Sequence, residues 1–123
     1  MANLLGWFEI PVTDIDRAVK FYSEVFSYES MQQMDFGGFK MAFFPGEQGS
    51  LGGALCSGEW YKPSHDGVMI YFNANPDLNG PLSNVEKAGG KVIMPKKQIS
   101  EEYGYMAMFE DSEGNRIALH SQN

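Results

Sequence analysis

Cysteine and basic residues are scarce in this sequence of 123 residues. The single cysteine, Cys56, excludes an internal disulfide and a zinc cluster built from cysteines. It fits a reducing cytoplasm, which is the location that we expect. Nine lysine and arginine residues stand against sixteen aspartate and glutamate residues, so the net charge is −7. Because nucleic-acid phosphates bind clustered basic side chains, we expect no nucleic-acid partner.

Long apolar runs are also missing. No window approaches the ~20 apolar residues that a membrane-spanning helix needs. The first six residues lack the basic and apolar regions of a targeting segment. We therefore expect no membrane partner. The length and the apolar content of 43% suit one domain over residues 1–123.

Hydrophobic periodicity predicts a defined order of elements in the first half of the chain. Residues 4–12 alternate as a strand does, and a helix capped by Thr13 or Asp14 is expected over 15–26. Turns rich in glycine then separate three expected strands, at 29–34, 39–44 and 51–57.

The same order begins again in the second half. A strand at 68–72 precedes a helix that opens at 75–77 and ends at Gly89-Gly90, with Pro81 tolerable only in its first turn. Three strands are then expected, at 91–94, 105–109 and 115–120. The prediction is an α+β fold of two βαβββ modules, at about 4–58 and 66–122. Side by side they would form a curved eight-stranded mixed sheet around an open space, the cup, with helices on the outer face.

Three segments carry a family resemblance: WFEIPVTDIDRAVKFYSEVF, DLNGPLSNVEKAGGKV and GYMAMFEDSEGNRIALHS. They resemble the vicinal-oxygen-chelate superfamily, which comprises glyoxalases, bleomycin resistance proteins and extradiol dioxygenases. The resemblance extends from Gly6 to Ser121 and is that of a small, single-domain glyoxalase-like member. It implies paired βαβββ modules, a small molecule in the cup and a homodimer. It does not imply one activity, because this fold hosts lyases, dioxygenases, epimerases and drug-binding proteins.

Metal-dependent members of that superfamily hold a divalent ion in the cup with two His, Glu or Gln side chains from each module. The residues at the corresponding positions here have no side-chain nitrogen or oxygen that can bind a metal ion; they are Trp7, Ala54, Gly67 and Ala118. Since a divalent ion needs three or more nitrogen or oxygen donors, we expect no metal and no other cofactor. A relocated site formed by Glu9, His65 and His120 is the alternative.

The strand faces turned away from the helices predict the lining of the cup. On the strand at 68–72, residues 68, 70 and 72 are expected to face the helices. The predicted ligand-contacting residues are Trp7, Glu9, Met41, Cys56, Met69, Tyr71 and His120. Such a lining suits a flat apolar or aromatic molecule held by one or two hydrogen bonds. The alternative is that the bulky side chains fill the cup.

Two functions are therefore open. The first is a metal-free protein that binds a small apolar or aromatic molecule, as bleomycin resistance proteins do. The second is an enzyme, either a lyase of the lactoylglutathione lyase type or a dioxygenase with relocated metal ligands, or a metal-independent catalyst. In the metal-independent case Glu9 would act as the base and Tyr71 or His120 as the acid. Glu9 could instead be a structural carboxylate that holds a neighbouring loop or tyrosine, and Cys56 a buried core thiol.

Overall fold

The two halves of the chain share one order of elements in the computed structural model, which describes residues 4–123. The first half contains β1 (Trp7–Pro11), α1 (Ile15–Phe26), β2 (Gln32–Asp35), β3 (Lys40–Phe43) and β4 (Gly52–Ser57). The second half contains β5 (Tyr71–Asn73), α2 (Asn79–Asn84), β6 (Lys91–Ser100), β7 (Gly104–Glu110) and β8 (Arg116–Ser121). The predicted α+β fold of two βαβββ modules is confirmed.

The strands divide into two four-stranded mixed sheets, with the orders β1-β4-β3-β2 and β5-β8-β7-β6. In each sheet the first strand of the module runs parallel to its last strand, and the other neighbours are antiparallel. Within residues 4–123 no ladder of hydrogen bonds joins β1 to β5. The region between these two strands is called the seam below, and it is bridged by the Phe8 and Phe72 rings, whose centroids lie 5.9 Å apart.

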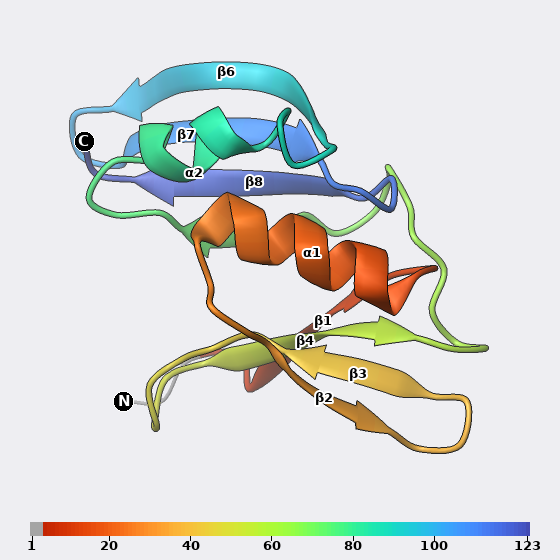
Figure 1. The fold of residues 1–123 in the computed structure, drawn as a ribbon. Coiled ribbons are helices and arrows are strands. Elements are labelled where there is room, and N and C mark those ends of the chain that lie inside the picture. The colour runs from red at the N-terminus through yellow and green to blue at the C-terminus, as the bar shows by residue number, and fades with distance from the viewer. Residues whose placement is uncertain (1–3) are drawn as a thin grey trace.

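Helix α1 is the central element of the core. Asp14 caps it, because its side chain accepts a hydrogen bond from the Arg17 backbone N–H at 3.1 Å. Figure 1 shows α1 lying between the two sheets, with α2 beside the second sheet. The buried side of α1 packs in one cluster with side chains from both sheets, among them Leu55 of β4 and Leu119 of β8. The two modules therefore share their core.

Helix α2 is shorter than the expected helix. It covers Asn79–Asn84, and Pro81 lies in its first turn as predicted. Turns continue to Gly89, which has a φ of +105° that favours glycine, so the predicted stop is in place. The Asn84 side chain donates to the Val25 carbonyl at 3.1 Å and ties α2 to the end of α1. Within residues 4–123 neither helix is long and apolar enough to cross a membrane.

Two strands differ from their predicted extents. β6 runs on to Ser100 instead of ending near 94; it is an edge strand with shifts of register, where Pro95 is tolerated. β5 begins only at Tyr71. Val68 was expected to face the helices, but its side chain is 94% exposed because it precedes the strand, whereas Ile70 and Phe72 do contact the core.

Candidate functional site

A cavity of about 820 Å³ opens at the seam. β1 contributes Trp7, Phe8 and Glu9 to its wall, and the segment leading into β5 contributes Met69 and Tyr71. Another side is supplied by the connection between β3 and β4, which begins at Phe44, and by Gly52 and Gly53 at the start of β4. The bulky side chains at the seam thus leave a cavity between them.

The predicted contact residues divide into two groups. Four of them line this seam cavity: Trp7, Glu9, Met69 and Tyr71. The other three, Met41, Cys56 and His120, are not among its lining residues. Met41 and Cys56 lie opposite each other on β3 and β4, nearer the middle of the first sheet.

Sequence reasoning missed the aromatic residues on the helix-facing side of the seam. Phe8, Phe44, Phe72 and Tyr28 also line the cavity, although all four pack against the core. The Phe8 and Phe44 centroids are 5.5 Å apart, and those of Phe44 and Phe72 are 5.3 Å apart. Period-two alternation assigns these rings to the core, but without a ladder between β1 and β5 the cavity reaches them too.

Two glycines on β4 allow the rings of β1 to lie against that strand. Trp7 pairs with Gly52, and Phe8 pairs with Gly53. A Cβ atom on Gly53 would lie 2.3 Å from the Phe8 ring, and one on Gly52 would lie 3.1 Å from the Trp7 ring. Both positions therefore require glycine unless the rings move, which explains why β4 begins with a pair of glycines.

Glu9 is held by two hydrogen-bond donors. The Tyr61 hydroxyl donates to Oε1 at 2.7 Å, and Trp7 Nε1 donates to Oε2 at 3.3 Å. The Tyr61 ring stacks on Phe39 with centroids 5.3 Å apart. The pKa of Tyr61 is raised, first because its hydroxyl is bonded to the Glu9 carboxylate and second by burial. Glu9 thus holds a tyrosine of the segment between the modules, the structural role that the sequence left open.

Cys56 is a core thiol. Its side chain is fully buried. Burial, followed by the negative charge of Glu9, raises its pKa to about 12. The thiol is therefore protonated near neutral pH and is not an activated nucleophile.

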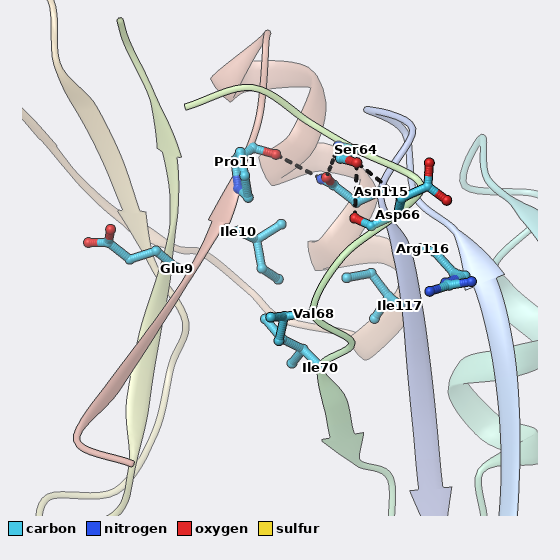
Figure 2. A pocket seen from close by; sticks show the side chains of 10 residues that line it. All are labelled: Glu9, Ile10, Pro11, Ser64, Asp66, Val68, Ile70, Asn115, Arg116 and Ile117. Carbon is cyan, nitrogen blue, oxygen red and sulfur yellow. Dashed lines mark hydrogen bonds between the residues drawn. The ribbon is translucent and has the colours of Figure 1, made fainter. Parts of the chain in front are cut away.

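A second cavity of about 240 Å³ lies between β1 and β8 and shares Glu9 with the first. Figure 2 shows the Glu9 carboxylate turned away from the polar group formed by Ser64 and Asn115. Asn115 is engaged there: its Nδ2 donates to the Pro11 carbonyl at 2.7 Å, and its Oδ1 accepts from the Ser64 N–H at 3.0 Å. These polar side chains join β1, the connecting segment and β8.

The two histidines lie apart from Glu9. His120 Nε2 is 2.6 Å from the Tyr103 carbonyl, which fixes the ring against the turn between β6 and β7. His65 Nε2 is 3.4 Å from Oε2 of Glu110, the last residue of β7. Across the described chain no three His, Cys, Asp or Glu side chains come together to hold a metal ion. The alternative site of Glu9, His65 and His120 is therefore not assembled.

Comparison with known proteins places this fold in a family. The family model described as the Glyoxalase/Bleomycin resistance protein/Dioxygenase superfamily matches residues 4–119. A glyoxylase-like domain-containing protein of Didymella fabae is 31% identical over 115 residues, which cover 90% of this chain and 88% of that protein. The chain belongs to the glyoxalase/bleomycin resistance protein/dioxygenase superfamily.

Solved structures of the superfamily share the fold. A glyoxylase/bleomycin resistance protein/dioxygenase domain from Frankia sp. EAN1pec superimposes with a TM-score of 0.73 at 15% identity and covers 100% of both chains. TnmS3, an antibiotic binding protein from Streptomyces sp. CB03234, has a TM-score of 0.65 at 20% identity and covers 99% of this chain and 98% of its own. Identities this low show a common fold and nothing about ligands.

The side chains of this superfamily member do not fit the divalent ion of its metal-dependent relatives. Ala54 lies opposite Glu9 on the β1–β4 ladder, and Ala118 lies opposite Tyr71 on the β5–β8 ladder. Neither alanine has a side-chain atom that can coordinate a metal. The Trp7 indole N–H can donate a hydrogen bond but has no lone pair for a metal ion. Glu9 alone among these residues could coordinate a cation, and one carboxylate does not make a divalent site.

Proposed function

We propose that this protein binds a flat, apolar or aromatic small molecule in the seam cavity. The observation that carries the proposal is the wall of that cavity: six aromatic side chains and one carboxylate are among the residues that line about 820 Å³. Binding sites for small molecules are typically concave and apolar, with a few polar groups that fix orientation. The volume is within the range of about 300–1,000 Å³ that such sites occupy.

One structural relative supports the ligand class. TnmS3 is named as an antibiotic binding protein, and it shares the fold over nearly the full length of both chains. A chain of this length and fold can therefore serve as a binding protein. Transfer of that role to this chain is part of the proposal.

We further propose that binding needs no metal. The support is the lack of metal-coordinating side chains at three of the expected ligand positions, which carry Trp7, Ala54 and Ala118. A homodimer and a cytoplasmic location complete the proposal. Leu5, Trp7 and Tyr71 are exposed apolar side chains at the edge of the cavity, and a second copy could cover them.

Thermal unfolding tests the proposal with naphthylmethanol, a neutral flat probe that the cavity can hold. We expect a saturable rise in Tm that is the same with and without a chelator, because only the folded state binds. Tyr71→Ala should weaken the shift, since Tyr71 lines the cavity. The matched control is Tyr103→Ala, an exposed tyrosine outside the cavity. Stoichiometric Zn, Ni, Fe or Mn in protein purified without a chelator or affinity tag would contradict the metal-free part.

A second candidate function is metal-independent acid–base catalysis. The hydrogen bond of 2.7 Å between Tyr61 and Glu9 favours it, since Glu9 lines the cavity and a carboxylate bonded to a phenol can exchange a proton with a ligand. In that case Glu9→Gln abolishes turnover and leaves ligand affinity intact, whereas a binding protein shows no turnover to lose.

A further inference from the structure

Glu9 is the only charged side chain that lines the seam cavity among the described residues. Its carboxylate accepts a hydrogen bond from the Trp7 indole at 3.3 Å, and within residues 4–123 no lysine, arginine or histidine forms an ion pair with it. A partly buried charge without a counter-ion is unfavourable, because water solvates it incompletely and no opposite charge replaces that water. A positively charged group in the cavity would remove this cost.

We propose that the cavity selects aromatic amines that carry a positive charge, with Glu9 as their counter-ion. This inference rests on the proposed function, because it specifies the ligand class of the same cavity. An ionised carboxylate has about four lone-pair sites, and the Tyr61 and Trp7 donors occupy two of them. The remaining sites can accept hydrogen bonds from an ammonium group. Hydrogen bonds between charged partners are about twice as strong as neutral ones.

The surrounding rings suit the same ligand. Trp7 lies on the Glu9 side of the cavity, and its ring packs edge-on against Phe43 with centroids 6.0 Å apart. The Tyr71 ring is half exposed on the opposite side of the seam. Faces of Trp and Tyr attract cations, and the apolar rings of Phe8, Phe44 and Phe72 can contact the aromatic body of the ligand. An anionic ligand would instead meet Glu9 without any cation in the wall.

Tyr61 is the positioning residue for this carboxylate. It lies in the segment between the modules, its ring is stacked on Phe39, and its hydroxyl reaches Oε1. The hydrogen bonds from Tyr61 and Trp7 thus restrict the orientation of the Glu9 carboxylate. A fixed counter-ion loses little conformational entropy on binding, which favours selectivity.

Calorimetric titration near neutral pH tests the inference with three probes of one shape: naphthylmethylamine, naphthylmethanol and naphthoate. The native protein should bind the amine about tenfold more tightly than the neutral alcohol, and the carboxylate most weakly. This order needs no variant and so does not depend on whether a variant folds. Glu9→Gln keeps an acceptor for Tyr61 and removes the charge, and it should lower the affinity for the amine to that of the alcohol. Tyr61→Phe keeps the charge but removes the hydrogen bond that positions the carboxylate, so it should reduce the preference for the amine without abolishing it.

The control is Glu24→Gln, which makes the same change of net charge on the exposed side of α1, away from the cavity. It should leave all three affinities unchanged. If it reduces amine binding as much as Glu9→Gln does, the preference comes from the overall charge of −7 and the inference is wrong. Equal affinity for amine and alcohol in the native protein also overturns the inference, while the proposed function stands. If none of the three probes binds, the proposed function itself is overturned.

Discussion

Gly53 determines how closely the Phe8 ring approaches β4. Phe8 is held in turn by Phe44 and Phe72, so its ring has little space to move. We expect Gly53→Ala to lower the free energy of unfolding by about 1–3 kcal/mol, since the added methyl group overpacks the seam. Urea denaturation followed by circular dichroism measures the change. An unchanged unfolding free energy would mean that Phe8 is not held against β4.

Gly80 is the matched control for that substitution. It lies in α2, its φ is not in the left-handed region, and a Cβ atom there would meet nothing within 4 Å. Gly80→Ala should leave stability unchanged or raise it by up to about 1 kcal/mol, because alanine favours a helix. The two substitutions add the same methyl group, so their difference isolates the contact with the Phe8 ring.

Single residues of the site differ in how far the sequence reveals them. Trp7, Glu9 and Tyr71 follow from alternation along two strands and were predicted at the cavity. Tyr61 was not, because the segment between the modules has no periodicity and its contact with Glu9 spans 52 residues. The lack of metal-coordinating side chains at positions 54 and 118 could be predicted from the sequence, since alanine cannot coordinate a metal ion.

At the scale of elements, the turn between β7 and β8 fixes the start of α1. Glu113 accepts hydrogen bonds from the Thr13 and Asp14 backbone N–H groups at 2.9 Å, and Arg17 Nε donates to it at 2.7 Å. The Glu113 side chain is completely buried. These donors hold the pKa of Glu113 at about 2, against the desolvation that opposes its charge. The sequence predicts the turn at 111–115, but not a partner about a hundred residues away.

These hydrogen bonds of Glu113 to the start of α1, called the Glu113 clamp below, make the stability of the protein depend on pH. The pKa of Glu113 is about 2 in the folded state and near 4.5 when unfolded, so the unfolded chain binds the proton more tightly. The stabilisation by Glu113 is therefore complete above about pH 4.5 and is lost as the pH falls toward 2. We expect Glu113→Gln to be less stable than the native protein by about 2 kcal/mol near neutral pH, allowing for solvent screening, and the difference should shrink in acid.

Urea denaturation of both proteins over that pH interval measures the difference. Asp111 titrates with the opposite sign, because burial chiefly raises its pKa, but both proteins retain it and its contribution cancels. Glu24→Gln again serves as the control for the loss of one negative charge and should leave the free energy of unfolding near neutral pH unchanged. If the difference in free energy of unfolding between the native protein and Glu113→Gln stays constant from neutral pH into acid, the Glu113 clamp does not depend on charge and the prediction is wrong.

At the scale of the whole molecule, the repeated order of elements was sufficient to predict the fold. The period-two strands and the glycine stop at 89 indicate the type and order of the elements, although the bounds of α2, β5 and β6 differ from the prediction. The gap between β1 and β5 was not predictable, because alternation along a strand does not report whether its edge is paired. That unpaired seam forms the cavity, which is why the phenylalanines of the core face were missed as part of its wall.

The shared core predicts that the two modules unfold together. Leu119 of β8 is fully buried in a cluster that also contains Leu55 of β4.

In a Trp60→Phe background, Trp7 fluorescence reports on the first module alone, since these are the only two tryptophans. Leu119→Ala should destabilise the protein by about 2–5 kcal/mol through the cavity it leaves. The Trp7 transition in urea should then move together with the circular dichroism transition. Leu4→Ala, at a fully exposed leucine, should move neither one. A Trp7 transition that stays in place while the second module melts would show that α1 does not couple the two sheets.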